Sequence, residues 1–491
     1  MSVKLRRTMA LLSAALLLAI PAAQAEGADV YEAEAAVLTG KNRVSGDAAA
    51  SGGKVVGRFE GQTDTVTFTI TVAQDGVYDL AFTSKGIGGG KYNNVIVDGE
   101  AQGQFQCPGT DFHTDALRGV LLTAGEHTVQ VTPSWGWIWL DKLEVIPAEP
   151  IPDSVYEVTS ELINPHANED ARELYAYLRE CYGKVTLAGQ VCDYGTTGPE
   201  MRAIHAVTGK YPALLGLDMM DYTPSRTALG ARGTAVDQAI RFHRQGGLVT
   251  FCWHWNAPTE YLKEGRDNNG SPRWWGGFYT DNSTFDIARV MAGQDAQGKA
   301  LLDRDIAEIA RQLLRLQEAG VPVLWRPLHE ASGGWFWWGA KGPEACKALW
   351  IYLYNELTFT YGCNNLIWVW NGQNPAWYPG DEYVDVIGED IYAANHTYGA
   401  QNAKFNEVLE YTAANKIIAL TENGVVPDID QLGLTNARWA WFCTWCGDFV
   451  QKNGHYSEAY TEAEILRKAY ESEFVITLDE LPDYLGGRDA Q

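Results

Sequence analysis

The stretch Val323-Leu-Trp-Arg-Pro-Leu-His-Glu330 indicates the fold of this chain, together with a second stretch, Lys416-Ile-Ile-Ala-Leu-Thr-Glu422. Each is a short apolar run typical of a strand, and each ends in a glutamate followed by small residues. Glu330 and Glu422 are 92 residues apart, close to three βα units of about 30 residues each. This spacing predicts that they end the fourth and seventh strands of a (β/α)8 barrel, on the face where such barrels carry catalytic residues.

The rest of residues 158–491 repeats this alternation of strand-like runs and helical patterns. The pattern predicts an α/β domain built as a (β/α)8 TIM barrel with insertions. The largest insertion, 256–300, is expected to fold over the catalytic face. The expected barrel strands are 184–189, 213–218, 247–254, 323–329, 365–370, 384–391, 416–421 and 439–445.

Residues 26–146 are predicted to form a separate all-β sandwich domain of the jelly-roll kind. Thr65-Val-Thr-Phe-Thr-Ile-Thr-Val72 alternates polar and apolar residues, as a half-buried strand does. Turn signals such as Gln74-Asp-Gly76 and Asp98-Gly99 separate this run from similar ones. Residues 147–157 are the expected linker, because Pro147, Pro150 and Pro152 favour a short, stiff, extended connection.

Residues 1–25 have the composition of a secretory signal peptide. A basic start is followed by an apolar stretch, residues 9–20, and by the small-residue cleavage pattern Ala23-Gln-Ala25. No later segment is long and apolar enough to predict a membrane span. We therefore expect a secreted, extracellular protein.

The formal net charge of -24 limits the classes of partner. An acidic surface repels the phosphates of nucleic acids and of anionic membranes, so neither is an expected partner. An acidic surface does not repel a neutral polymer, so a neutral polymer is the favoured class of substrate. We expect the chain to act as a monomer.

Export permits disulfide bonds among the eight cysteines. Cys181 with Cys192 and Cys346 with Cys363 are candidate local pairs, although the sequence does not choose among the many pairings. Cys443-Thr-Trp-Cys446 has the spacing of a redox or zinc motif. No second such pair or nearby histidine accompanies it, so strand residues or a structural disulfide are favoured.

Two strand-end carboxylates in a chain with 12% aromatic residues indicate chemistry on a glycosidic bond. Such chemistry needs one carboxyl that gives a proton and one that attacks or stabilises the sugar. The stretch Arg326–Gly339 closely resembles the signature of glycoside hydrolase family 26. The segments 253–255, 388–392 and 420–422 resemble further motifs of that family, in the family's order.

Endo-β-1,4-mannanases with a retaining mechanism dominate this family, so the resemblance implies β-mannan as substrate and no cofactor for catalysis. It assigns Glu330 as acid/base and Glu422 as nucleophile. His329 and Tyr392 match residues that bond to the nucleophile in the family. Asp390 lies two residues before Tyr392 on the same strand face and is a candidate for substrate binding.

The resemblance also implies sugar contacts in both halves of the cleft. His254 matches a residue in the glycone half, Trp445 one at the reactive sugar, and Trp335 one on the aglycone side. Cys446 stands where the family often has arginine, which leaves the fine subsite preference open. Arg326 is expected inside the barrel, where its role is as readily structural as functional.

Two segments of the first domain, 31–34 and 135–141, look like those of a family 35 carbohydrate-binding module. This resemblance implies a structural calcium ion held by Glu32, Glu34 and Asp141, against the alternative of exposed strand carboxylates. Trp137 is the expected sugar platform there, unless it belongs to the core.

Other specificities remain open from the sequence. The same family signature would suit a β-1,3-1,4-glucanase or a β-1,3-xylanase, because subsite shape decides between them. A non-catalytic carbohydrate-binding protein is the alternative of a different class, and the presence of both glutamates argues against it.

Overall fold

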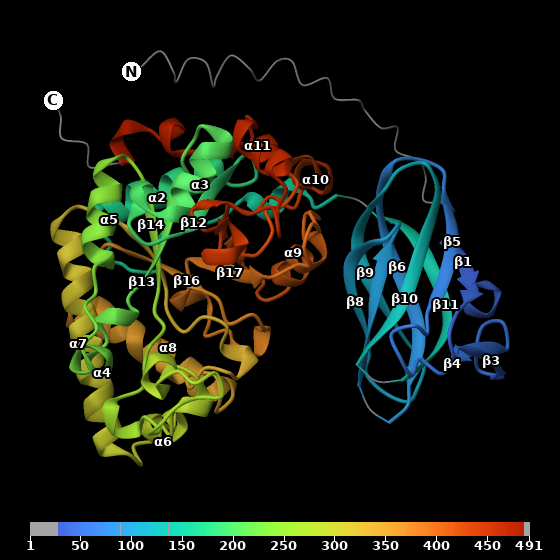
Figure 1. Cartoon of the computed structure of the whole chain (residues 1–491), viewed down its shortest axis with the longest axis horizontal. Helices are drawn as coiled ribbons and strands as arrows, with labels where there is room; N and C mark the ends of the chain where they lie inside the picture. Colours follow the sequence, from blue (N-terminus) through green and yellow to red (C-terminus); the bar gives the residue numbers. More distant parts are fainter. Residues whose placement is uncertain (1–27, 89, 136, 149, 486–491) are drawn as a thin grey trace.

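The computed structural model describes residues 28–485 except 89, 136 and 149, and it shows two domains joined by a short connection (Figure 1). The expected signal peptide, residues 1–25, lies outside the described residues. Within the part that is described, no helix has both the length and the apolar character needed to cross a membrane.

The first domain is a sandwich of two antiparallel sheets, as predicted. One has the order β3-β4-β11-β6-β9 with β1 on β11, and the other the order β2-β5-β10-β7-β8. β5 turns its alternate residues Val66, Phe68, Ile70 and Val72 into the core. The strands are β1 Asp29–Glu32, β2 Val37–Leu38, β3 Arg43–Gly46, β4 Lys54–Gly57, β5 Val66–Val72, β6 Gly76–Gly86, β7 Lys91–Val97, β8 Glu100–Cys107, β9 His113–Leu122, β10 Gly125–Trp135 and β11 Ile138–Ala148.

The start of the expected linker continues the last strand of the sandwich. In β11, Pro147 pairs with Tyr78 and Ala148 with Val77. A 3-10 turn, η2 (Asp153–Tyr156), follows, and the Tyr156 hydroxyl accepts a hydrogen bond from the backbone N–H of Arg438. The connection is therefore anchored at both ends, in the sandwich and on the barrel.

The second domain is the predicted parallel barrel. β12 pairs with β13 on one side and with β19 on the other, which closes the ring of eight strands. All eight expected strand runs are present, with most residues buried, as is typical of parallel strands covered on both faces. The barrel strands are β12 Thr186–Val191, β13 Leu214–Asp218, β14 Leu248–Cys252, β15 Val323–Arg326, β16 Leu366–Trp370, β17 Val386–Ile391, β18 Ile417–Asn423 and β19 Trp441–Thr444.

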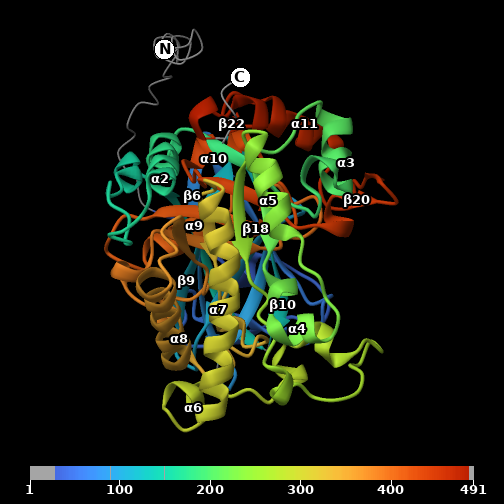
Figure 2. The same cartoon turned by 90° about the vertical axis from the view of Figure 1, so that its left-hand side faces the viewer.

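Helices cover the outside of the barrel, with α5 and α7 prominent in Figure 2. The longest, α7, begins after Asp295, whose side chain accepts a hydrogen bond from the Gly298 N–H and caps the helix. The α-helices are α2 Glu169–Cys181, α3 Pro199–Thr208, α4 Pro224–Ala228, α5 Ala235–Arg244, α6 Ile287–Met291, α7 Ala296–Glu318, α8 Pro343–Asn355, α9 Asn402–Leu409, α10 Ile429–Thr435 and α11 Ala463–Glu471. The short strands β20 Gln451–Lys452, β21 His455–Tyr456 and β22 Val475–Ile476 complete the domain.

The insertion 256–300 packs on the segment that follows Glu330. The Thr280 N–H donates to the Trp335 carbonyl, and the Trp337 N–H donates to the Phe278 carbonyl. The insertion therefore lies at the face of the barrel where the strands end, as expected.

The candidate disulfide pairs do not form, since all eight cysteines are free. Cys181 precedes β12 and Cys192 follows it, so the length of the strand separates them. Cys346 lies in α8, which continues directly into a π-helical segment, η9 (Glu356–Thr360), and Cys363 follows that segment. Closeness in sequence is misleading here because a whole regular element lies between the partners.

A buried carboxyl on β17 gives a prediction about stability. Glu389 is 1% exposed, and its Oε1 has no hydrogen-bond partner. Burial raises its pKa to about 7. Because the folded-state pKa is the higher one, this group stabilises the fold at low pH. That contribution is lost as the pH rises from the unfolded pKa of about 4.3 through about 7.

Glu389→Gln carries no titrating group, so it should lose less stability than the wild type at alkaline pH. Between pH 5 and pH 8, the unfolding free energy of the wild type should fall by about 2 kcal/mol more than that of Glu389→Gln. Urea unfolding across this range measures the effect, with exposed Glu464→Gln on α11 as the matched control. Parallel curves for Glu389→Gln and the wild type would show that Glu389 does not titrate differently in the folded state.

Candidate active site

The chain turns sharply between β15 and Glu330. Leu328 and Glu330 both have left-handed backbone conformations, with φ of 55° and 52°. Such conformations are costly for residues other than glycine and persist only where other contacts impose them. One such contact is the hydrogen bond of 2.7 Å from the Glu330 N–H to the Asn371 carbonyl. The strand therefore ends at Arg326, three residues before the predicted end, and Glu330 is held by a turn.

Glu330 and Glu422 meet at the end of the barrel together with Asp390. One carboxylate oxygen from each of the three lies within 4.8 Å of the other two. Retaining glycosidases keep their two carboxyl groups about 5–5.5 Å apart, whereas inverting enzymes need about 6.5–9.5 Å for a water molecule. The observed separation is too short for a water-sized gap between Glu330 and Glu422.

Arg326 compensates the charge of this group. Its side chain is 4% exposed, and Nη1 lies 2.8 Å from Asp390 Oδ2, while Nη2 donates to Glu422 Oε1. Burial opposes the charged form, but the Asp390 and Glu422 carboxylates raise the pKa of Arg326 well above its usual value. The structure thus places Arg326 directly on the predicted nucleophile.

The second oxygen of Glu422 accepts a hydrogen bond of 2.5 Å from the Tyr392 hydroxyl, as the resemblance implied. Burial and then the Glu422 charge raise the pKa of Tyr392, so this hydroxyl keeps its proton and donates. Asp390, a predicted substrate contact, is engaged differently. Its Oδ2 accepts from Arg326 and its Oδ1 accepts from the Thr421 hydroxyl at 2.7 Å. Both Asp390 oxygens are therefore occupied by protein donors.

Glu330 has an environment suited to a proton donor. Burial, followed by the charge of Glu422, raises its pKa above the usual glutamic acid value. Its Oε2 accepts a hydrogen bond of 3.0 Å from the indole N–H of Trp335, a side chain that is 48% exposed. Gly333 makes room for this ring, because a Cβ there would lie 2.2 Å from the Trp335 Cη2 atom. Trp335 is thus both a contact of Glu330 and an accessible aromatic surface.

His329 contacts a different partner from the one that the resemblance implied. Its Nε2 lies 3.2 Å from the Nε2 of His254, and no hydrogen bond joins it to Glu422 among the described residues. The His254 ring centroid lies 6.2 Å from that of Trp445. His254, His329 and Trp445 therefore form one wall of the site, whereas Trp335 adjoins Glu330.

Sequence reasoning missed two polar residues that hold the site together. The Asn371 side-chain oxygen accepts from Arg326 at 3.2 Å and from the Glu330 N–H at 3.3 Å. Asp218 binds the ring of His254. Asn371 directly follows β16 and Asp218 ends β13, so their position at strand ends is the signal that could have found them.

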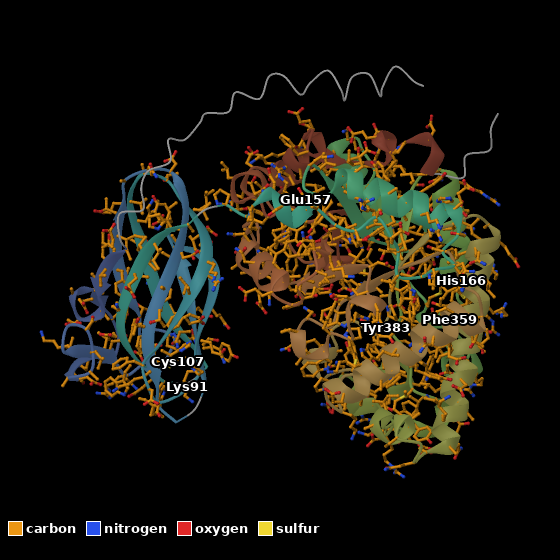
Figure 3. All side chains as sticks on the ribbon, turned by 180° about the vertical axis from the view of Figure 1, so that it is seen from behind. Lys91, Cys107, Glu157, His166, Phe359 and Tyr383 are labelled. Carbon is orange, nitrogen blue, oxygen red and sulfur yellow. The ribbon has the colours of Figure 1, made fainter. Side chains whose placement is uncertain are left out.

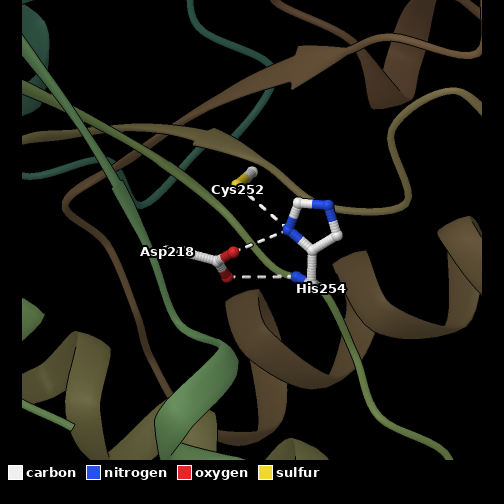
Figure 4. A group of neighbouring side chains, drawn as sticks. All are labelled: Asp218, Cys252 and His254. Atoms are coloured by element: carbon white, nitrogen blue, oxygen red, sulfur yellow. Dashed lines mark hydrogen bonds and ion pairs between the residues drawn. The ribbon is translucent and has the colours of Figure 1, made fainter. Parts of the chain in front are cut away.

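Asp218, Cys252 and His254 form a second compact group (Figure 4). Asp218 Oδ2 and His254 Nδ1 are 2.6 Å apart, a hydrogen-bond distance. Two ligands of one tetrahedral zinc ion, each about 2.0–2.1 Å from the metal, would lie about 3.3 Å apart. The arrangement is therefore a carboxylate–imidazole pair beside a buried thiol rather than a metal site.

Three carboxylates of the sandwich domain gather around the turn at Ser51. The Ser51 hydroxyl donates to Glu32, and its N–H donates to Asp141 at 3.0 Å. Glu34 Oε2 is buried without a hydrogen-bond partner, and burial raises the pKa of Asp141, to which Glu32 and Glu34 add. The donor chemistry of this group suits a calcium ion, which prefers several oxygen ligands, although oxygens of all three carboxylates do not lie within 4.8 Å of one another in this structure.

Trp137 lies at the end of the sandwich away from the linker. Its carbonyl accepts from the Ile87 N–H near the start of β7, the end where Figure 3 shows Lys91 and Cys107. Its side chain is 51% exposed, so it does not belong to the core.

Comparisons with known proteins agree with this geometry. The sequence of residues 163–480 matches glycosyl hydrolase family 26, and that of residues 29–148 matches carbohydrate binding module family 35. A mannan endo-1,4-beta-mannosidase from Thermothelomyces thermophilus is 40% identical over 94% of this chain and 92% of its own length. Mannan endo-1,4-beta-mannosidase B from Piromyces sp is 34% identical over 92% of this chain and 77% of its own length.

A solved structure resembles this chain over both domains. The crystal structure of the Podospora anserina GH26-CBM35 beta-(1,4)-mannanase is 40% identical and has a TM-score of 0.65, covering 94% of this chain and 99% of the other. The family match extends over more than half of the chain. The chain therefore belongs to glycosyl hydrolase family 26 and carries a family 35 carbohydrate-binding module ahead of its barrel.

Proposed function

We propose that this chain is a secreted endo-β-1,4-mannanase that cleaves mannan, galactomannan and glucomannan with retention of configuration. The observation that carries the mechanism is the short separation of Glu330 and Glu422, with Glu422 bonded by Arg326 and Tyr392. The names of its relatives from Thermothelomyces thermophilus and Piromyces sp support the substrate. The basic and apolar pattern of residues 4–20 supports export.

The reaction proceeds by two displacements at the anomeric carbon. Glu422 attacks this carbon while Glu330 gives its proton to the leaving sugar oxygen, which forms a covalent glycosyl-enzyme. Glu330 then takes a proton from water, and the water oxygen displaces Glu422 from the sugar. All the groups that these steps require are side chains of the barrel, so the bond cleavage requires no cofactor.

Aromatic side chains supply the sugar-binding surface. Trp335 presents an exposed ring beside the acid, and Trp445 presents its ring beside His254. Aromatic rings pack well against the apolar faces of sugars. Trp137 supplies a similar surface on the binding module, at the end of the sandwich distant from the linker.

Loss of the nucleophile tests the central assignment. Glu422→Ala should lower kcat on galactomannan and glucomannan on the order of 10³-fold or more, because no covalent intermediate can form. Reducing-sugar release by the purified chain on both mannans and on barley β-glucan measures this, with exposed Glu464→Ala as control. Cleavage confined to β-glucan would overturn the substrate, and full activity of Glu422→Ala would overturn the mechanism.

The role of Glu330 can be tested with the leaving group. Glu330→Ala should lose on the order of 10³-fold activity on mannan. Its kcat/KM on a dinitrophenyl β-mannobioside should fall far less, because this constant reports the first displacement and the leaving group there needs no proton. Wild-type activity should fall as the pH rises through the raised pKa of Glu330, and this alkaline limb should be absent in the variant on the activated substrate. An unchanged alkaline limb would assign it to another group.

We propose a structural calcium ion held by Glu32, Glu34 and Asp141. Removing calcium with a chelator should lower the melting temperature of the sandwich domain, and added calcium should restore it. Glu34→Gln should abolish the response, whereas cleavage of soluble manno-oligosaccharides should change little because the barrel is a separate domain. A melting temperature insensitive to calcium would contradict the proposal.

A further inference from the structure

Asp218 uses most of its hydrogen-bonding capacity on one neighbour. Its Oδ2 accepts from the ring Nδ1 of His254 at 2.6 Å, and its Oδ1 accepts from the backbone N–H of His254 at 3.1 Å (Figure 4). Oδ1 also accepts from the Met220 N–H at 2.8 Å. Burial alone would raise the pKa of Asp218, but the contacts with His254 lower it, so the carboxylate is ionised. Asp218 therefore clamps both the backbone and the ring of His254.

The contact continues from His254 to the residue before the acid. His254 Nε2 lies 3.2 Å from the Nε2 of His329, which is 1% exposed. Only one proton fits between two nitrogens at this distance, so one ring must donate and the other must accept. The direction of this bond depends on which nitrogen of His254 carries its proton.

The second ring nitrogen of His329, Nδ1, decides the direction of the hydrogen bond between the two histidines. This nitrogen is buried and has no hydrogen-bond partner. If His254 donated, His329 would carry its proton on Nδ1, as a buried N–H without an acceptor, and such orphan donors are rarer than unpaired acceptors. If His329 donates from Nε2, its Nδ1 is a bare lone pair and His254 carries its proton on Nδ1. The second arrangement also gives Asp218 the donor that its Oδ2 requires.

We propose that Asp218 is a positioning residue that acts through His254. It holds His254 as the neutral Nδ1–H tautomer with its ring fixed, so that Nε2 accepts from His329 beside the reacting carboxylates. This inference rests on the proposed function, in which the wall formed by His254 and Trp445 contacts the sugar. The centroid of the His254 ring also lies 4.7 Å from that of Phe278 and 5.5 Å from that of Phe336. A rotated imidazole would therefore disturb its packing against these two rings.

Low pH disturbs the hydrogen bond between His254 and His329. Burial opposes a charge on His254, but Asp218 raises its pKa, whereas burial and then His254 lower the pKa of His329. An added proton therefore goes to His254 Nε2, where it faces the donor of His329 and forces the bond to reverse. The titratable and charged groups around His254 are Asp218, Cys252, His329, Arg326, Glu330 and Glu422.

Asp218→Asn should reverse the direction of the hydrogen bond between His254 and His329 with almost no change in the size of the side chain. The single amide oxygen must face the two backbone N–H groups of Met220 and His254, because an NH2 group there would oppose two donors. The amide NH2 then faces Nδ1 and forces the His254 proton onto Nε2. His329 is left with a buried, unpaired Nδ1–H.

The experiment combines a spectroscopic and a kinetic readout. Long-range ¹H–¹⁵N spectra of the full chain labelled at histidine report which ring nitrogen carries the proton, and His254→Ala identifies the His254 signals. We expect Nδ1–H in the wild type and Nε2–H in Asp218→Asn. We expect kcat/KM on a manno-oligosaccharide to fall on the order of 10-fold to 100-fold in Asp218→Asn. Asp221→Asn, on the turn that follows β13, should stay close to the wild type.

A double-mutant cycle separates this role from a general structural one. Asp218→Asn should cause no further loss in the His254→Ala background if it acts only through His254. An equal loss in both backgrounds, or an Nε2–H tautomer in the wild type, would overturn the proposal. The wild-type spectrum decides the tautomer even if a variant folds poorly. Because the spectra need no substrate, a chain that did not cleave mannan but kept the expected tautomers would refute the proposed function alone.

Discussion

The buried guanidinium of Arg326 is the constraint on which the site depends. Glu422 and Asp390 lie together at the end of the barrel, with Glu330 within 4.8 Å of both, and Arg326 binds the first two. Buried carboxylates repel one another unless a cation compensates them, and removing one partner of such a group is more costly than never building it. The planar fork of arginine can serve two carboxylates at once, which an ammonium group does less well.

The barrel places these groups, but the turn after β15 completes the arrangement. The strand ends at Arg326, and the left-handed residues Leu328 and Glu330 turn the chain where a strand would have extended it. Asn371 stabilises the turn from the neighbouring strand and also touches Arg326. The positions of the acid and of the cation are therefore coupled through one amide side chain.

Much of this could be predicted from sequence, for a physical reason. Buried parallel strands are continuous apolar runs, so all eight were visible, and residues at their carboxyl ends, such as Glu422 and Tyr392, meet at one face. The partner of His329 could not be predicted, because a ring can turn to either neighbour and only packing decides. Asp218 and Asn371 are single polar residues without a pattern. The disulfide pairs failed because sequence distance does not measure the length of the element between two cysteines.

The electrostatics also explain how one residue can serve first as acid and then as base. While Glu422 is ionised, its charge adds to burial and keeps the proton on Glu330. Bond formation to the sugar removes the charge of Glu422, so this contribution disappears while the positive charge of Arg326 remains. Arg326 lowers the pKa of Glu330, and its effect is then less opposed. The first chemical step therefore makes Glu330 more acidic at the moment when it gives up its proton. The second step reverses this change by restoring the carboxylate.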